Sequence, residues 1–277
     1  MKPAPFEYVR AGSVDEALVA LADGGEDAKP IAGGQSLVPA LTMRLVRPSV
    51  LVDVNHAGLD GITANGGVRI GATVRQAALA GDERAHPLVR QALPFVGHFV
   101  TRNRGTIGGS IAHADGAAEL PLCLAVLDGT VVAESGRGRR EIAAADFFVT
   151  HFSTTLEPGE LVVETVWPHA RGGEESAFEE LALRTGDFAQ SMAAVVLGRA
   201  DGIVVEARVG VGAVSDRPTR LAEVEALLVG SSGTEAAADA GALAARLVDP
   251  PSTTHASSGY LRSLTGTLVR RAIERAR

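Results

Sequence analysis

Two glycine pairs stand out among the residues that could bind a ligand. One lies in IAGGQS at residues 31–36 and the other in TIGGS at residues 106–110. Glycine lets a backbone approach a ligand closely and adopt positive φ. Free N–H groups in such a turn, or at the start of a following helix, bind phosphate. Two such loops in one chain favour a ligand with two phosphates, such as a dinucleotide held from both sides.

Each loop also has a purely structural interpretation. The first could be an ordinary tight turn, because it does not match the G-x-G-x-x-G pattern of a dinucleotide-binding turn after a strand. The second could be a basic surface turn, since RNRG at residues 102–105 precedes it. Their joint occurrence favours the binding interpretation for both.

Length, charge and the distribution of apolar residues limit the kinds of protein that this sequence can encode. The 277 residues are enough for one large domain or for two to three small ones. A net charge of −7 argues against a nucleic-acid partner, which needs clustered lysine and arginine. The first ten residues, MKPAPFEYVR, lack the apolar segment of a signal peptide, and no apolar run reaches membrane-spanning length. We therefore expect a soluble, cytoplasmic protein.

The single cysteine, Cys123, excludes most metal chemistry. An iron–sulfur cluster usually needs four cysteines, and structural zinc needs several ligands at set spacing. Cys123 lies in an apolar helical stretch, so we predict a buried core residue. We expect no metal site, and no residue is predicted to act as a catalytic acid or base.

Hydrophobic spacing predicts mixed helix and strand in the first part of the chain. A capping box at residues 13–16 opens a helix, and Ser36 and Thr73 are expected to cap two more. A further helix is expected near residues 117–127. Strands are predicted at residues 29–32, 50–54, 68–72, 130–133 and 161–166.

A polar stretch rich in Gly and Arg at residues 168–175 is the best linker candidate. After it, strands at 178–183, 193–197 and 203–214 precede helices at 218–229, 234–247 and 260–276. The expected fold class is therefore α+β, with a small C-terminal domain in which helices back a three-stranded antiparallel sheet. The predicted domains are residues 1–172, with subdomains of about 1–55 and 56–172, and residues 173–277.

The two loops carry a resemblance to a known family. Residues 32–36 together with 106–110 resemble the paired flavin-binding signature of the medium subunit of molybdenum hydroxylases, the family of carbon monoxide dehydrogenase and xanthine dehydrogenase. LEPGEL at 156–161 and RTGDFA at 184–189 extend the resemblance, as does the closing helix, over essentially the whole chain. It implies a flavin-binding domain of two subdomains, with FAD stretched between them and its diphosphate gripped by both loops.

The resemblance also implies individual cofactor-binding residues. Glu119 would hydrogen-bond ribityl or ribose hydroxyls, Leu161 would contact the flavin ring through its backbone, and Phe188 would shield that ring. A solvated helix carboxylate is the alternative for Glu119, and core packing is the alternative for Leu161 and Phe188. The full predicted FAD site is Ile31, Ala32, Gly33, Gly34, Gln35, Ser36, Thr106, Ile107, Gly108, Gly109, Ser110, Glu119, Leu161 and Phe188.

Four positions depart from the family pattern. Ser110 stands where many members have Asn, Gly116 where Pro is usual, Phe188 where some have Tyr, and Thr253 where Asp is usual. The serine hydroxyl can still donate to phosphate, and the phenylalanine keeps an aromatic face. Gly116 loosens the turn that leads to Glu119.

The function implied by the resemblance is electron transfer. The medium subunit of the family holds FAD and passes electrons from a small subunit with two two-iron two-sulfur clusters to a terminal acceptor. A large subunit carries the molybdenum cofactor and oxidises the substrate, and the whole is a dimer of heterotrimers. Two alternatives stay open: a stand-alone FAD-dependent oxidoreductase, and an assembly subunit that has lost FAD. The absorption spectrum and the co-purifying chains would separate them.

Overall fold

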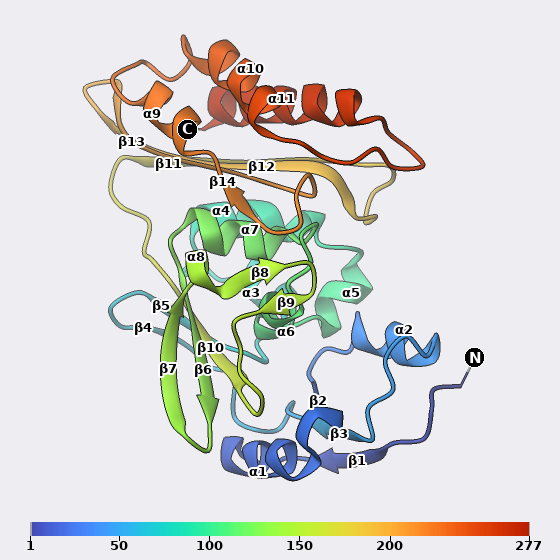
Figure 1. Ribbon diagram of the computed structural model, residues 1–277. Helices are drawn as coiled ribbons and strands as arrows, with labels where there is room; N and C mark the ends of the chain where they lie inside the picture. Colours follow the sequence, from blue (N-terminus) through green and yellow to red (C-terminus); the bar gives the residue numbers. More distant parts are fainter. Residues whose placement is uncertain (1, 277) are drawn as a thin grey trace.

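The computed structural model describes residues 2–276, which form three tiers of β-sheet stacked along the molecule (Figure 1). The lowest tier is a parallel sheet in the order β1-β3-β2, with α1 packed against it. Ser13 caps α1 by accepting the Glu16 N–H at 3.1 Å, as the capping box predicts. The elements of this tier are β1 (Glu7–Arg10), α1 (Val14–Gly24), η1 (Gly25–Asp27), β2 (Ala28–Ile31) and β3 (Val50–Asp53).

The first glycine loop connects β2 to α2 (Leu37–Thr42). Ser36 is the residue before this helix, but its side chain makes no capping hydrogen bond, so that prediction is wrong. Its backbone is already helical, with φ −98° and ψ −42°, whereas a capping side chain requires an extended backbone.

The middle tier is an antiparallel sheet in the order β4-β5-β10-β6-β7. Its predicted strands are present, but β4, β7, β8 and β9 were not predicted. The sequence of β7, GRREIA, is mostly polar because this strand lies at a sheet edge. The strands of this region are β4 (Ile62–Ala64), β5 (Val68–Gly71), β6 (Thr130–Ser135), β7 (Gly138–Ala143), β8 (Phe148–Thr150), β9 (Ser153–Thr154) and β10 (Leu161–Trp167).

Short helices surround this sheet: α3 (Gln76–Ala80), α4 (Pro87–Ala92), η2 (Leu93–Phe95), α5 (Phe99–Arg104), α6 (Ile107–His113), α7 (Glu119–Val126) and α8 (Ala144–Phe147). Thr73 caps none of them, because α3 begins after Arg75 and Thr73 is buried. Cys123, within α7, is completely buried in the core, as predicted.

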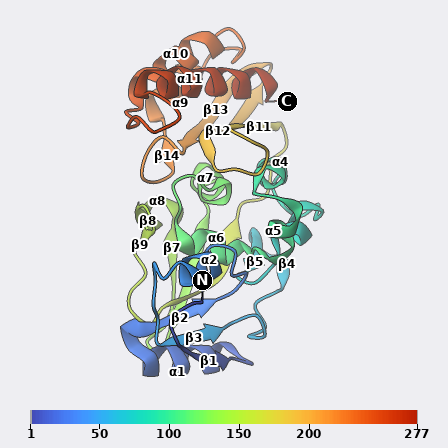
Figure 2. The same cartoon turned by 90° about the vertical axis from the view of Figure 1, so that its right-hand side faces the viewer.

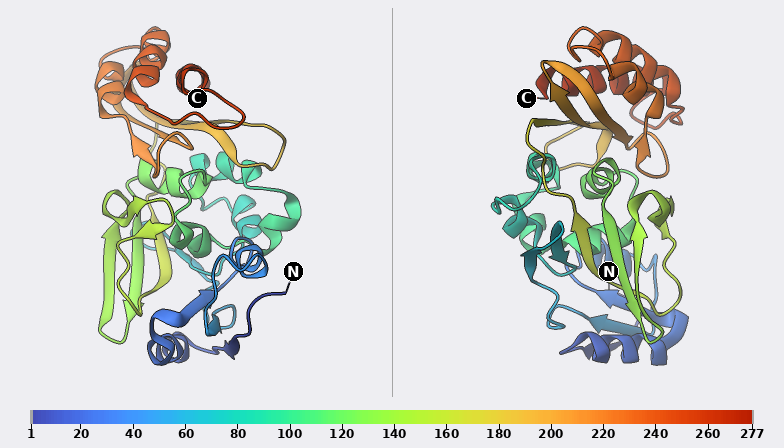
Figure 3. Two further views of the ribbon diagram at one scale, coloured as in Figure 1. Left: turned by 45° about the vertical axis from the view of Figure 1, so that its right-hand side comes forward. Right: turned by 90° about the vertical axis from the view of Figure 1, so that its left-hand side faces the viewer.

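The upper tier is an antiparallel sheet in the order β11-β12-β13-β14. The three predicted strands are present, and the two-residue β14 adds a fourth. Helices α9, α10 and α11 cover one face, while α4 and α7 lie under the other (Figures 2 and 3). The elements are β11 (Glu174–Ala182), β12 (Ala189–Ala200), β13 (Ile203–Gly212), β14 (Thr219–Arg220), α9 (Ala222–Leu228), α10 (Ala237–Leu247) and α11 (Ser258–Arg275).

Strand β11 is an edge strand, and a side chain of α4 occupies part of its open edge. The Gln91 amide donates to the carbonyl of Ser176 at 3.2 Å and accepts the N–H of Phe178 at 3.1 Å. One side chain therefore satisfies the two groups that a neighbouring strand would otherwise bind.

Candidate functional site

The two glycine loops lie against each other. Gly33 packs on the backbone of Arg104 and Gly105, and a Cβ on Gly33 would lie 2.4 Å from the Arg104 carbonyl oxygen. Only glycine allows so close an approach. Gly109 of the second loop faces Ala32 of the first, since a Cβ on it would lie 3.9 Å from that side chain. The structure therefore brings together both predicted phosphate-binding loops.

The first loop presents a row of unused amides. Its carbonyls are occupied: Asn55 donates to Ala32 O at 2.9 Å, and the Gln35 side chain donates to Gly33 O at 3.1 Å. Because the peptide unit is planar and trans, each N–H that follows points away from the occupied carbonyl. The amides with no acceptor among residues 2–276 are those of Gly33, Gly34, Gln35, Ser36 and Leu37. Such a group suits an anion.

The second loop differs from expectation, because the protein uses its amides itself. The N–H groups of Ile107 and Gly108 each donate at 3.0 Å, to Val74 O and Ala72 O respectively. The Gly109 N–H donates to the Thr106 hydroxyl at 3.2 Å, which caps α6. Ile107 and Gly108 are buried, so a ligand can reach only Gly109 and Ser110 of this loop at its half-buried end.

Two carboxyl groups outside the loops, on α7 and β11, have raised pKa values. Glu119 opens α7, is 8% exposed and forms no side-chain hydrogen bond to another residue of 2–276. Burial raises its pKa to about 7. Glu180 on β11 has a pKa raised to about 8, first by burial and then by the charge of Glu119, and its Oε2 is buried without a partner. A carboxyl group that stays protonated at neutral pH can donate a hydrogen bond as well as accept one.

Sequence reasoning found Glu119 but missed Glu180. The signal for the latter was faint: Glu179 and Glu180 are two of four glutamates in this strand, and their residue type alone does not distinguish them. Alternation in a strand sends one of them to each face. Glu179 pairs with Arg275 of α11 and Glu180 faces α7, which no pattern in the sequence specifies.

The remaining two predicted residues lie in different regions. Phe188 is 73% exposed in the turn between β11 and β12, so it does not pack in the core. This turn lies on the start of α5, because Gly186 packs against the ring of His98. Leu161 is buried at the start of β10 in the hydrophobic core that β3 shares. The structure does not bring Leu161 to the Phe188 turn, and its side chain takes the core-packing role.

The structure explains two departures from the family pattern, Gly116 and Thr253. A Cβ at Gly116 would lie 2.9 Å from the Ser215 carbonyl oxygen and from the His151 ring, which leaves no room for a side chain. Thr253 accepts the N–H groups of His255 and Ala256 through its hydroxyl, at 3.2 and 3.0 Å. That hydroxyl supplies the acceptor that an aspartate would provide.

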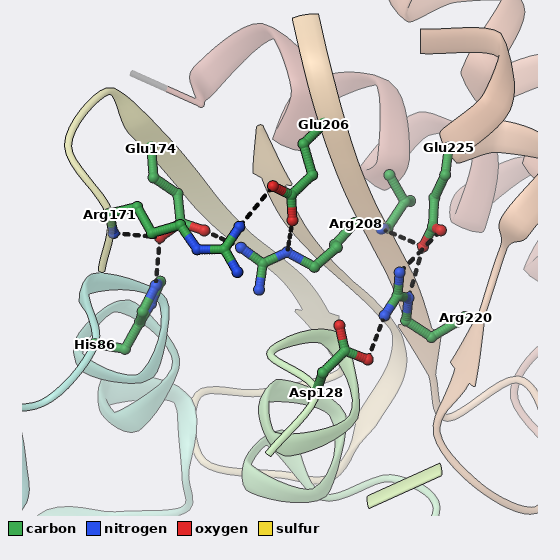
Figure 4. A network of polar contacts seen from close by, with 9 residues as sticks. His86, Asp128, Arg171, Glu174, Glu206, Arg208, Arg220 and Glu225 are labelled. Atoms are coloured by element: carbon green, nitrogen blue, oxygen red, sulfur yellow. Dashed lines mark hydrogen bonds and ion pairs between the residues drawn. The ribbon is translucent and has the colours of Figure 1, made fainter. Parts of the chain in front are cut away.

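A second polar cluster joins α4 to the upper sheet (Figure 4). His86 accepts the Leu88 N–H at its Nδ1, so the neutral ring donates from Nε2 to Glu174 at 3.2 Å. Glu174 also pairs with the buried Arg208 and accepts the Arg171 N–H at 2.9 Å. Burial, and then the charge of Arg208, lower the pKa of His86 to about 4. Nearby, Arg220 pairs with Asp128 and Glu225.

Neither a membrane span nor a metal centre is found in the part of the chain that the structure describes. No helix within residues 2–276 has both the length and the apolar character needed to cross a bilayer. The same residues place no three histidine, cysteine or carboxylate side chains where they could hold one ion.

Comparison with known proteins decides the family. Residues 4–170 match the model for the FAD binding domain in molybdopterin dehydrogenase, and residues 176–276 match the CO dehydrogenase flavoprotein C-terminal domain. The chain belongs to this flavoprotein family. It is therefore an oxidoreductase subunit with FAD as its cofactor, and the free amides of the first loop and the unpartnered Glu119 fit the phosphates and hydroxyls of that group.

Relatives match along the full chain. It is 43% identical to the 6-hydroxypseudooxynicotine dehydrogenase complex subunit alpha of Paenarthrobacter nicotinovorans, covering 100% of this chain and 96% of that protein. It is 35% identical to the carbon monoxide dehydrogenase medium chain of Afipia carboxidovorans, over 100% and 98%. A chain of quinoline 2-oxidoreductase from Pseudomonas putida 86 matches with a TM-score of 0.95 and 38% identity, over 100% and 98%.

Proposed function

We propose that this chain passes electrons from the iron–sulfur clusters of a partner subunit to a terminal acceptor, through FAD bound between its lower and upper tiers. The first glycine loop carries the proposal, because it offers five consecutive free amides for a diphosphate at the point where the second loop packs against it. Bound FAD supplies the electron chemistry, and the chain binds, orients and shields it. The alternative is a stand-alone FAD-dependent oxidoreductase.

The proposed FAD contacts follow the structure from the first loop upward. The amides at residues 33–37 bind the diphosphate, with Gly109 and the Ser110 hydroxyl against its other side. Glu119 accepts from ribityl or ribose hydroxyls, and the Phe188 turn covers the flavin ring. We also propose a domain boundary at residues 172–173, between β10 and β11, with a subdomain boundary near residue 55, after β3.

The proposed partners are a small iron–sulfur subunit and a large molybdenum-cofactor subunit, assembled as a dimer of heterotrimers. An exposed apolar surface near the proposed ring site supports a partner there. Phe99 and Val100 of α5 are each 68% exposed, and Leu183 and Phe188 in the adjoining turn are 55% and 73% exposed. Soluble proteins rarely leave such groups of side chains uncovered. Arg184 in the same turn supplies a charge for orientation.

The partner subunits are expected to determine the substrate. Relatives bear names as different as carbon monoxide dehydrogenase, caffeine dehydrogenase and glyceraldehyde dehydrogenase, although this chain aligns with each of them over nearly its whole length. One flavin-binding fold accompanying such varied names supports substrate oxidation in another chain.

A substitution in the first loop tests the FAD site. Gly33→Ala places a methyl group against the Arg104 carbonyl, and separating the loops costs about 1–3 kcal/mol, which is about fivefold to 150-fold in FAD affinity. Gly136→Ala is the matched control, because nothing lies within 4 Å of a Cβ there. Flavin fluorescence of the full chain titrated with FAD measures both. Equal affinities for the two variants would place FAD elsewhere.

Electron transfer requires a second experiment. The chain purified alone is expected to oxidise no aldehyde or N-heteroaromatic compound, whereas its FAD absorbance bleaches under anaerobic conditions when substrate and the partner subunits are added. Val100 lies in the exposed apolar surface outside the proposed FAD contacts, and Val100→Ala should slow that bleaching without releasing FAD. Turnover by the isolated chain would instead establish the stand-alone oxidoreductase.

A further inference from the structure

A chain of hydrogen bonds runs between the two glycine loops on the side away from the free amides. Asn55, just after β3, donates to Ala32 O of the first loop at 2.9 Å. Its side-chain oxygen accepts from Arg75 Nη2 at 2.7 Å. Arg75 Nη1 in turn donates to Arg104 O at 2.6 Å. The Arg104 carbonyl is the same group that packs against Gly33, so the contacts close a ring.

Asn55 and Arg75, the two side chains of this bridge, are each held by further hydrogen bonds. Asn55 is held by Asp53, which accepts its backbone N–H at 2.9 Å and the hydroxyl of Tyr8. The backbone of Arg75 is paired with Thr106, and the following Gln76 N–H donates to Gly105 O at 3.0 Å. The lowest tier therefore holds the first loop, the middle tier holds the second, and Arg75 is the side chain that spans them.

Arg75 also forms no direct ion pair with a carboxylate of residues 2–276. No acidic oxygen among residues 2–276 lies within 4.0 Å of its guanidinium, although the side chain is half-buried. Burial and then the nearby Arg104 lower its pKa, and the carboxylate of Asp53 raises it by less, so the guanidinium still lacks a full countercharge. A diphosphate bound at the adjoining amides would supply that charge.

We propose that Arg75 is the positioning residue of the FAD site: its guanidinium fixes the separation of the two glycine loops and thereby orients the free amides for the diphosphate. The inference rests on the proposed location of FAD at these loops. Arginine suits the task because its planar fork serves two acceptors at once, whereas lysine offers a single point of charge. The bridge reaches the ligand through the Ala32–Gly33 peptide, whose carbonyl it holds.

The test compares charge with geometry in the full chain after removal of FAD. Arg75→Lys keeps the charge and loses the fork, and Arg75→Gln loses both. We expect each to weaken FAD binding by about tenfold to a hundredfold, the effect of one charge-assisted hydrogen bond. ADP, which carries a diphosphate without a flavin ring, should lose affinity in parallel. Arg69→Lys is the control, since that β5 arginine pairs with Glu164 and Glu141 outside the loops.

Further readouts separate positioning from general damage. Asn55→Ala should weaken FAD binding, and adding it to Arg75→Lys should weaken binding little more, because both break one bridge. Riboflavin, which lacks phosphate, should bind Arg75→Lys and the unsubstituted chain alike, whereas a damaged fold would weaken both ligands. Unchanged FAD affinity in Arg75→Lys would overturn the proposal, including the case in which only Arg75→Gln is weakened. If the unsubstituted chain bound neither FAD nor ADP, the proposed site itself would fail.

Discussion

Strand β11 carries two glutamates on the face turned toward the helices below it, about 20 Å apart along the strand, and their surroundings are opposite. Glu174, its first residue, meets His86, Arg208 and the Arg171 amide. Glu180 forms no ion pair among residues 2–276, feels the charge of Glu119, and keeps one oxygen without a partner. The paired end is a structural joint between α4 and the upper sheet. The unpaired end holds a buried carboxyl group with a raised pKa, a feature that is common at binding sites.

An apolar stretch on this face of β11 separates Glu174 from Glu180. Between them, Phe178 packs on Phe95 with ring centroids 5.5 Å apart, so the middle of the strand is apolar. A buried charge is costly unless it is paired, which restricts unpaired carboxyls to places where a ligand or a proton offsets the cost. The comparison therefore predicts that the two ends respond differently to substitution and to pH.

The largest expected effect is loss of the paired joint. Arg208→Met removes the main countercharge of a buried carboxylate and should lower the free energy of unfolding by about 3–5 kcal/mol. Arg171→Met is the matched control, because its exposed pair with Glu206 should contribute less than about 1 kcal/mol. Urea denaturation at pH 7 measures both. Similar losses in the two variants would remove the distinction between a buried joint and a surface pair.

Acid should weaken the paired end. The pKa of His86 is about 4 in the folded chain, against an ordinary value of 6.5. The unfolded chain therefore binds more protons between these values, and stability falls as the pH drops from 6.5 toward 4, by up to about 3 kcal/mol. Urea midpoints at pH 7, 5 and 4 follow the loss. His86→Gln should make this decline shallower; an unchanged pH profile would show that His86 is not its cause.

Alkali should weaken the unpaired end, with a smaller effect. The folded chain raises the pKa of Glu180 to about 8, so it binds more protons than the unfolded chain above the ordinary value of 4.5. Its contribution to stability should fall as the pH rises through this window, by about 1–2 kcal/mol after allowance for partial exposure, and it opposes the contribution of His86 below pH 6.5. Melting of the FAD-free chain at pH 5, 6.5 and 8 measures it. Glu180→Gln should flatten the decline, and Glu179→Gln should not; the reverse order would contradict the assignment.

The sequence predicted the α+β fold well because its strands are apolar runs bounded by turn residues. It failed at β7, whose charged residues lie on a sheet edge, and at Ser36, whose backbone was already helical. Local patterns report propensity, and they do not report what a neighbouring element provides.

The same limit applies to the candidate site: local patterns predicted the loops, and contacts between distant segments decided which groups are free. Glycine spacing located both loops, yet only contacts across the fold decide whether an amide is free. The amides of Ile107 and Gly108 donate to the segment after β5, while those of the first loop have no acceptor. Glu180 and Arg75 could not be found from the sequence, because their significance comes from pairing between segments far apart in the chain.

The side chain of Gln91 on the edge of β11 has a consequence for how the protein can be divided. An uncovered strand edge templates pairing with other chains, which leads to aggregation. Residues 173–277 expressed as a fragment would lack α4 and would expose the carbonyl of Ser176 and the N–H of Phe178. The upper sheet thus depends on the first part of the chain for its solubility. Because α4 precedes β11 in the chain, it is synthesised first and is available to cover the edge of β11.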